Sequence, residues 1–195
     1  MEETKIHSSA VIDKGAQIGS GTIIWAFAQV GANAIVGKKC VLGNGCYIDR
    51  NANIGNNTKV MNKAQVFRGC SVGSNVFIGP AAVIANDKWP SPGTERKFSG
   101  YEWKIGNGVS VGANSVILPD VNVGDFALIG AGSVVTKDVP KHGLVYGNPA
   151  KLHGFVCKCR ERMGLVSKGD GTAVLQCKKC KQGLTLPMDL FNKIE

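Results

Sequence analysis

The sequence predicts an all-β fold: a parallel β-solenoid of six-residue units with one ejected loop and a small cysteine-rich unit at its C-terminal end. Three observations support this prediction, namely a ladder of aliphatic residues six apart, a single break in that ladder, and four cysteines beyond it. The ladder extends over about two thirds of the chain, and a short fixed period is typical of solenoids.

The aliphatic ladder recurs without a miss over its first stretch and resumes after one interruption. Its first members are Ile6, Ile12, Ile18, Ile24, Val30, Val36, Leu42, Ile48, Ile54, Val60, Val66, Val72, Ile78 and Ile84. Its later members are Ile105, Val111, Ile117, Val123, Ile129 and Val135. A period of six fits neither a helix nor a long alternating strand. Short strands joined by turns, three to a coil, would stack into roughly six to seven coils.

Small residues occupy two further places in the repeat. Cys40, Cys46 and Cys70 fall four residues after a ladder position, where Ala and Thr otherwise stand, so we expect them to fill space in the core. Glycine often follows the ladder residue, as at Gly19 and Gly55. We expect these glycines to supply corner backbone angles that a side chain with a Cβ resists.

The break in the ladder predicts an ejected loop. Residues 85–104 are polar and contain two prolines and two tryptophans, and long loops on compact solenoids are often functional. After Val135, Pro140 and Pro149 predict the exit from the solenoid. We therefore divide the chain into residues 1–150, which hold the solenoid and its loop, and residues 151–195, which form a C-terminal extension ending in a short strand or helix.

The C-terminal extension contains a C-x-C pair and a C-x-x-C pair. The four residues are Cys157, Cys159, Cys177 and Cys180. Four thiolates are the right number for a tetrahedral site and favour Zn²⁺. The extension is too small for an adequate hydrophobic core, so a structural zinc would supply much of its stability. It resembles a zinc ribbon, although Arg160 and Lys181 stand where such knuckles often have glycine. The alternative is four thiols without a complete metal site.

The charge and composition of the chain limit its partners and compartment. The formal net charge of +9 favours an anionic partner. Residues 151–195 contribute +5 of it, from nine Lys or Arg against four acidic residues. Because no aromatic and basic motif accompanies the charge, nucleic acid is not expected as a partner.

No apolar run reaches the roughly 20 residues of a membrane span. Residues 1–5 lack the apolar segment of a signal peptide, so we expect a cytoplasmic protein without membrane insertion.

The order of these features resembles a known family. Coils of six-residue units are followed by a loop that opens with Asn86, by the segment Gly-Ala-Gly-Ser-Val-Val-Thr-Lys-Asp-Val-Pro, by Gly-Asn-Pro-Ala-Lys and by a cysteine knuckle. This order resembles the hexapeptide-repeat acyltransferases of the left-handed β-helix kind, and among them the nucleotide-sugar N-acetyltransferases that acetylate the 3-amino group of UDP-linked diamino sugar uronates in surface-polysaccharide synthesis. The left hand of the solenoid comes from this resemblance alone.

The resemblance implies an acetyl-CoA-dependent N-acetyltransferase. It implies a homotrimer that binds acetyl-CoA in a groove between two subunits. The residues that would contact acetyl-CoA are Ala113, Gly130, Ala131, Lys137, Lys141 and Lys151. The three lysines are candidates for binding its phosphates as point charges.

The resemblance also implies roles for residues around the loop. Asn86 would orient the amine or the developing oxyanion, and Asp87 would hold the amine or help to remove its proton. Residues 18 apart would stack on neighbouring coils and gather a polar cluster there. The candidates for binding the acceptor are Lys59, Asn62, Gln65, Phe67 and Arg68. The family often has an acidic residue after the aromatic at this place, whereas this chain has Arg68.

The positions of the histidines favour an amine as the acceptor. Hydroxyl acceptors usually need a general base, but the chain has only His7, His142 and His153, all outside the loop. A neutral amine is already a nucleophile, so positioning can supply much of the rate. The alternative is an O-acetyltransferase that uses His142 or a base from a neighbouring subunit. A γ-class carbonic anhydrase would need three histidine ligands from coils that hold none between residues 8 and 141.

Overall fold

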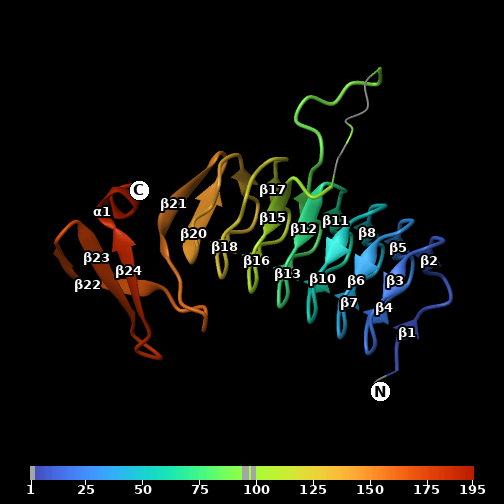
Figure 1. Ribbon diagram of the computed structural model, residues 1–195, viewed down its shortest axis with the longest axis horizontal. Coiled ribbons are helices and arrows are strands. Elements are labelled where there is room, and N and C mark those ends of the chain that lie inside the picture. The colour runs from blue at the N-terminus through green and yellow to red at the C-terminus, as the bar shows by residue number, and fades with distance from the viewer. Residues whose placement is uncertain (1–2, 94–96, 98–99) are drawn as a thin grey trace.

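The computed structural model describes residues 3–93, 97 and 100–195 and shows an elongated prism with a loop projecting from one edge (Figure 1). The predicted left-handed parallel β-helix is confirmed. Its strands are mostly two residues long and stack into three parallel sheets, one for each face of the prism. We name the sheets A, B and C in the order in which the chain visits them.

Successive coils contribute one strand to each sheet. Sheet A contains β1 (Lys5–Ile6), β4 (Ile23–Ile24), β7 (Val41–Leu42), β10 (Lys59–Val60), β13 (Phe77–Ile78), β16 (Ser110–Val111), β18 (Leu128–Ile129), β20 (Gly143–Gly147) and β21 (Ala150–Phe155). Sheet B contains β2 (Val11–Ile12), β5 (Gln29–Val30), β8 (Tyr47–Ile48), β11 (Gln65–Val66), β14 (Val83–Ile84), β17 (Val116–Ile117) and β19 (Val134–Val135). Sheet C contains β3 (Gln17–Ile18), β6 (Ile35–Val36), β9 (Asn53–Ile54), β12 (Cys70–Val72) and β15 (Trp103–Ile105).

The ladder residues form the core of the prism. Each pairs with the ladder residue of the next coil, as Val60 does with Ile78, and those from Ile24 to Val135 are buried. Ile6 is 47% exposed because it lies in the first coil, at the end of the stack. Cys40, Cys46 and Cys70 are buried in the same core. Their predicted role as small core residues is confirmed.

The glycines after the ladder positions are required for a different reason from the one that we expected. Gly19 and Gly55 do not have a positive φ; instead, a Cβ on Gly55 would lie 2.5 Å from the carbonyl carbon of Gly73 in the next coil. The left-handed backbone conformation falls two residues later, where Gly21 and Asn57 adopt it. The expectation of strained corner angles at these glycines is therefore wrong, and close stacking of the coils explains them.

The solenoid continues beyond its predicted exit. Val139 pairs with Val123, and Val145 in β20 pairs in parallel with Ile129 in β18. These partners are 16 residues apart instead of 18, because the preceding turn is two residues shorter. The ladder therefore changes phase after Val135 without ending there, and the first proline does not terminate the coil. The chain turns back through β21, which pairs antiparallel with β20.

The ejected loop and the C-terminal unit are the two departures from the repeat (Figure 1). The loop leaves after β14, and the coil resumes at the buried Trp103 of β15, which pairs with Cys70. The C-terminal unit contains β22 (Met163–Gly169), β23 (Thr172–Cys177), β24 (Gly183–Pro187) and α1 (Met188–Phe191). It thus ends in both a strand and a short helix. Among the described residues, no helix has the length and apolarity to cross a bilayer.

Candidate functional site

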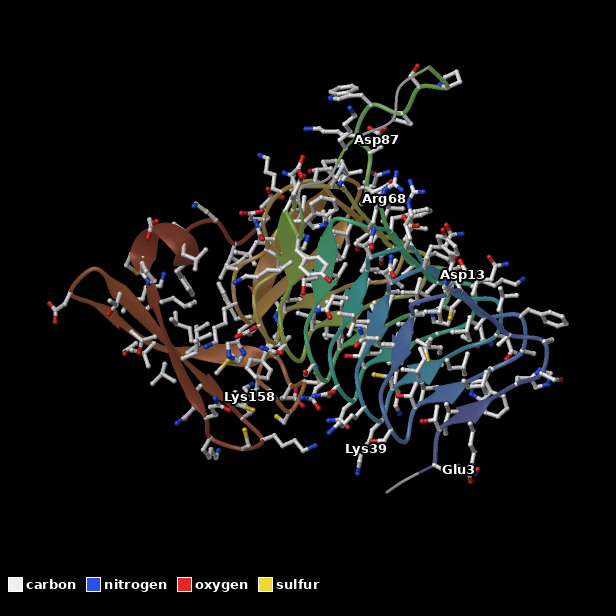
Figure 2. All side chains as sticks on the ribbon, turned by 45° about the vertical axis from the view of Figure 1, so that its right-hand side comes forward. Glu3, Asp13, Lys39, Arg68, Asp87 and Lys158 are labelled. Atoms are coloured by element: carbon white, nitrogen blue, oxygen red, sulfur yellow. The ribbon has the colours of Figure 1, made fainter. Side chains whose placement is uncertain are left out.

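One edge of the prism collects several of the side chains that could carry chemistry. We call it the B–C edge, because the chain passes there from sheet B to sheet C. The residues two places after the ladder position of sheet B stack along it in the order Arg50, Arg68, Asn86, Pro119 and Lys137, as the registers of β8, β11, β14, β17 and β19 require. Adjacent strands lie about 4.8 Å apart. Figure 2 shows Arg68 and Asp87 on this edge, at the foot of the loop, and Lys39 on a different edge.

A buried carboxylate organises the edge below the loop. Asp49, which is 7% exposed, accepts the backbone N–H of Arg50 at 2.7 Å through Oδ1 and that of Arg68 at 3.2 Å through Oδ2. The Tyr47 hydroxyl donates to the same Oδ1 at 3.0 Å, and its ring lies 5.6 Å from that of Phe67. Burial and then the contact with Asp49 raise the pKa of Tyr47. One carboxylate therefore fixes the corners of two coils.

The loop begins at the two predicted catalytic residues. Asn86 and Asp87 are both partly buried directly after β14, and Asp87 Oδ1 accepts the backbone N–H of Trp89 at 2.9 Å. The returning strand of the loop is tied to the previous coil, because the N–H of Glu102 donates to the carbonyl of Gly69 at 2.8 Å. The first bond shapes the outgoing end of the loop, and the second holds its returning end on the prism.

The five predicted acceptor residues lie on different faces of the prism. Phe67 and Arg68 lie on the B–C edge, and Gln65 lies on sheet B between Tyr47 and Val83. Lys59 belongs to sheet A, and Asn62 to the turn between sheets A and B, where its Oδ1 accepts the N–H of Asn44 at 3.0 Å. The structure therefore brings Gln65, Phe67 and Arg68 together and separates Lys59 and Asn62 from them.

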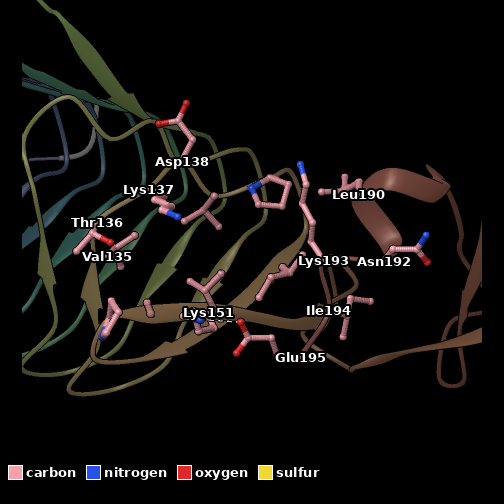
Figure 3. Close-up of a pocket in the computed structure, with 16 residues that line it drawn as sticks. Val135, Thr136, Lys137, Asp138, Lys151, Leu190, Asn192, Lys193, Ile194 and Glu195 are labelled. Atoms are coloured by element: carbon pink, nitrogen blue, oxygen red, sulfur yellow. Dashed lines mark hydrogen bonds and ion pairs between the residues drawn. The ribbon is translucent and has the colours of Figure 1, made fainter.

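A pocket of about 650 Å³ lies at the far end of the same edge, between the last coil and the C-terminal segment (Figure 3). Lys137, Lys151 and Lys193 contribute to its lining, and Leu190 and Ile194 are among its apolar residues. The Nζ of Lys151 donates to a carboxylate oxygen of Glu195 at 2.7 Å. Asp138 and Glu195 also line the pocket, so its three ammonium groups face two carboxylates and leave a single excess positive charge among these side chains. This excess makes the pocket a candidate site for an anionic ligand.

The other predicted acetyl-CoA residues lie elsewhere in the single chain. Ala113, Gly130 and Ala131 stack at the edge between sheets A and B, where Gly132 N–H donates to the Ala113 carbonyl at 2.8 Å. Lys141 is exposed on the turn from sheet C to sheet A. Of the six residues, only Lys137 and Lys151 line the pocket.

None of the three histidines lies at the foot of the loop. His142 is buried where the solenoid meets the C-terminal unit, stacks on Phe126 and donates from Nδ1 to the Val156 carbonyl at 2.8 Å. Burial lowers its pKa. His153 stacks on Tyr146 with ring centroids 3.7 Å apart, and His7 lies after the first strand. His142 is therefore not open to an acceptor.

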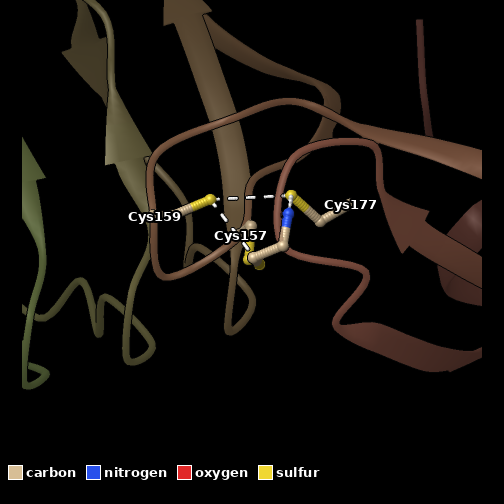
Figure 4. Close-up of side chains that lie close together, drawn as sticks. Cys157, Cys159 and Cys177 are labelled. Carbon is tan, nitrogen blue, oxygen red and sulfur yellow. Dashed lines mark hydrogen bonds between the residues drawn. The ribbon is translucent and has the colours of Figure 1, made fainter.

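The four predicted metal ligands form one cluster, and Figure 4 labels Cys157, Cys159 and Cys177. Their sulfur atoms all lie within 4.8 Å of one another, with 3.3 Å between Cys157 and Cys180, 3.5 Å between Cys159 and Cys177, and 3.8 Å between Cys159 and Cys180. A tetrahedral site with Zn–S bonds of about 2.3 Å has sulfur separations of about 3.8 Å, so the cluster fits zinc. The N–H of Cys180 lowers the pKa of Cys177 to about 7, which favours a thiolate.

The knuckle conformation forms without the glycines that often follow such cysteine pairs. Arg160 has φ 73° and Lys181 has φ 61°, so both occupy the left-handed region. Arg160 Nη2 also donates to the carbonyl of Gly108 in the solenoid, and the Lys158 ammonium lies 4.7 Å from the centroid of the Phe126 ring. The two substitutions therefore keep the turn, and one of them ties the knuckle to the β-helix.

Sequence reasoning missed five residues of these sites. They are Tyr47, Asp49, Arg50, Lys193 and Glu195. A signal for Arg50 was present, because Arg50, Arg68 and Asn86 are 18 residues apart and so occupy the same place in successive coils. The same spacing places Tyr47 and Asp49 beside the predicted Gln65 and Phe67. Lys193 and Glu195 gave no such signal, since only the packing of the C-terminal segment against the last coil brings them to the pocket.

Two stretches of the sequence match a known family of repeat proteins. The family described as bacterial transferase hexapeptide (six repeats) matches residues 15–50 and 104–137. These are coils on either side of the ejected loop. The match is thus to the repeat itself, in 70 of the 195 residues (36 before the loop and 34 after it).

The chain is also similar to individual acyltransferases. The chain is 47% identical over 75 residues to dTDP-3-amino-3,6-dideoxy-alpha-D-galactopyranose 3-N-acetyltransferase from Aneurinibacillus thermoaerophilus, which is 38% of each chain. A mutant of GDP-perosamine N-acetyltransferase from Caulobacter crescentus, solved with CoA and GDP-perosamine, shares 25% identity and a TM-score of 0.51 over 78% of this chain and 57% of that one. LpxA, a UDP-N-acetylglucosamine acyltransferase from Bacteroides fragilis, shares the fold, with 21% identity and a TM-score of 0.67 over 79% and 62%. The chain thus spans less than two thirds of each of these relatives.

Proposed function

We propose that the protein is an acetyl-CoA-dependent N-acetyltransferase that acts on the amino group of a nucleotide-linked amino sugar in surface-polysaccharide synthesis. The observation that carries the proposal is the B–C edge, which holds Arg68, the Asn86 and Asp87 pair and Lys137, and Lys137 opens onto the lysine pocket. The similarity to dTDP-sugar and GDP-perosamine N-acetyltransferases supports the same reaction class. Arg68 at one end of the row, and the excess of lysines over carboxylates at the other end, suit a phosphorylated substrate.

The lysine pocket is the proposed site for the phosphates of acetyl-CoA. Lys137 and Lys151 were candidates from the sequence, and Lys193 adds a third cation to the same lining. Lys137 lies two strand spacings from Asn86, or about 10 Å along the edge. The pantetheine arm would run along that distance and bring the thioester to the foot of the loop.

The acceptor amine would attack the thioester carbonyl beside Asn86. The new C–N bond forms, the C–S bond breaks, and the CoA sulfur leaves as the thiolate while the nitrogen loses a proton. The Asn86 amide would donate a hydrogen bond to the oxyanion, and Asp87 would take part in orienting the amine. A neutral amine needs no general base for attack, which agrees with the absence of histidine from this part of the described chain.

The test is a screen of UDP-, dTDP- and GDP-linked amino sugars with acetyl-CoA, in which release of free thiol is measured. Matched hydroxy sugars in the same screen separate N- from O-acetylation. We expect turnover with an amino sugar, and we expect Asn86→Ala to lower kcat/KM for that sugar by about tenfold or more. Turnover with hydroxy sugars alone would favour the O-acetyltransferase. Unchanged kinetics of Asn86→Ala would remove the proposed role of this residue.

A homotrimer would bring the two separated sets of acetyl-CoA residues together. Ala113, Gly130 and Ala131 lie on a different edge from the lysine pocket, so a groove between two chains would combine one edge from each. The exposed apolar side chains Ile35 and Phe77 on the outer faces of the prism are available to such contacts. Size-exclusion chromatography with light scattering should give three times the chain mass, and a monomer with full activity would contradict this arrangement.

The cysteine cluster is proposed as a structural zinc site. All four sulfurs would bind the ion, which leaves no open position for substrate, so zinc would supply cross-linking energy and no catalysis. Metal analysis of the purified protein should find about one zinc per chain. Protein that is fully active and stable without zinc would contradict the assignment. Reduced thiols and an acetyl-CoA donor both agree with the expected cytoplasmic location.

A further inference from the structure

A second cavity lies at the foot of the loop, on the side of Asn86 opposite to the lysine pocket. Its volume is about 380 Å³, and its lining consists of Asn51, Arg68, Gly69, Gly100 and Tyr101. Tyr101 is 50% exposed. A guanidinium, an amide and an aromatic ring therefore meet in one concave space, and this set of groups suits a ligand that contains both an anion and a flat ring.

Arg68 lines this cavity, and Arg50 precedes it by one coil. Arg50 and Arg68 occupy the same place in neighbouring coils, so their backbones lie one strand spacing apart, or about 4.8 Å. The carboxylate of Asp49 binds both of their backbone N–H groups. The backbone positions from which the two side chains extend are thereby fixed relative to each other. Because Asp49 uses one oxygen for each backbone N–H, the pair is pre-organised at the corner.

We infer that this cavity binds the nucleoside diphosphate part of the acceptor. Arg68, with Arg50 from the coil before it, would bind the two phosphate groups, since a guanidinium matches phosphate oxygens with two parallel hydrogen bonds. Tyr101 would stack on the base, as aromatic side chains do on bases generally. The inference rests on the proposed function, to which it adds the position and orientation of the acceptor.

The spacing along the edge supports this orientation. Asn86 lies one strand spacing beyond Arg68, about 4.8 Å, so a sugar bound next to the diphosphate would have its amino group near Asn86. Acetyl-CoA would approach from the lysine pocket at the other end. The donor and the acceptor would therefore meet at the loop from opposite directions, and each would have its own cationic site.

The charge and the position of Arg68 suit a diphosphate, because its guanidinium belongs to the lining of the cavity. Tyr101, at the end of the ejected loop, makes the loop part of the acceptor site.

Binding of UDP, dTDP, GDP and inorganic pyrophosphate to the full chain, measured by titration calorimetry without acetyl-CoA, tests the inference. We expect Arg68→Gln to raise the Kd of the preferred nucleoside diphosphate and of pyrophosphate by about tenfold or more. Tyr101→Ala should weaken the nucleoside diphosphate and leave pyrophosphate unchanged, whereas Tyr101→Phe, which keeps the ring, should bind both normally. Lys63→Gln is the charge-matched control, because it removes one cation from the exposed turn between sheets A and B.

The outcomes separate this inference from the proposed function. An equal loss of affinity in Lys63→Gln and Arg68→Gln would show a general charge effect and overturn the inference. The inference would also be overturned if Arg68→Gln and Tyr101→Ala acetylated the nucleotide-linked sugar normally, with an unchanged KM for the acceptor. Conversely, if nucleoside diphosphates bind with the expected variant pattern but no nucleotide-linked amino sugar is acetylated, the inference stands and the proposed function fails. The Kd of CoA, measured in the same variants, should stay constant and confirm that they are folded.

Discussion

The β-helix and the C-terminal unit of this protein obtain their stability in different ways. The β-helix has one continuous core in which every coil covers the next, from Ile24 to Val145. The buried core of the C-terminal unit consists of Phe155, Cys157, Met163, Leu175, Cys177 and Leu186, and two of these belong to the thiol cluster. A repeat can bury apolar surface simply by adding coils, whereas a unit of this size needs a cross-link.

Removal of a zinc ligand should have the largest effect, and it should be confined to the C-terminal unit. Apparent binding free energies of structural zinc are about 10–16 kcal/mol, so Cys177→Ser should lose the metal and unfold that unit. Cys46→Ala, in the β-helix core, is the matched control and should retain one zinc. Metal content and limited proteolysis measure both effects. If Cys177→Ser keeps a protease-resistant C-terminal unit, the comparison between the two regions fails.

A pair of glycine substitutions compares the packing of the two regions. Gly55→Ala would place a Cβ against the backbone of the next coil and should destabilise the β-helix by about 1–3 kcal/mol. Gly169→Ala in β22 meets no heavy atom within 4 Å, so the free energy of unfolding should change by less than about 0.5 kcal/mol. Thermal and denaturant unfolding measure the difference. Equal effects would show that coil stacking is less tight than the structure indicates.

The smallest effect is expected at the junction of the two regions, from His142. Because its pKa is lowered in the folded protein, the unfolded chain binds more protons between that pKa and the ordinary value of about 6.5. Its contribution to stability is therefore complete above about pH 6.5 and is lost as the pH falls through the folded pKa. His142→Asn keeps a donor for the Val156 carbonyl and suits the φ of 63°. The melting temperature of this variant should fall less than that of the wild type between pH 7 and pH 5; an identical fall would exclude His142 as its cause.

The sequence predicted the parts of the fold that repeat and missed those that depend on the packing of distant segments. The ladder located nearly every strand, and the break at Ile84 located the loop. The shortened last coil was missed, because its two-residue deletion moves Val139 and Val145 out of phase. The role of Gly55 was misread for a related reason: close approach of the next coil cannot be distinguished from corner strain in a sequence.

The candidate sites divide in the same way. The cysteine spacing predicted a cluster, and the structure brings the four sulfurs together. Lys59 and Asn62 were grouped with Arg68 because they are close in sequence, yet a triangular coil turns between sheets every six residues and places them on different faces. Tyr101 and Lys193 reach their cavities only through the return of the loop and the packing of the C-terminal segment.

The sequence by itself determined a repeating prism, because a six-residue period with small and aliphatic residues at fixed places satisfies the core of every coil locally. It also determined the break at Asn86 and the four thiols. Only the tertiary structure decided that Arg50, Arg68, Asn86 and Lys137 form one row. Residues on neighbouring coils are 18 apart in the sequence, or 33 apart where the loop intervenes, yet stacking brings their strands to about 4.8 Å from each other. The proposed site lies along that row, with a cavity that contains Arg68 on one side of the loop and a pocket that contains Lys137 on the other.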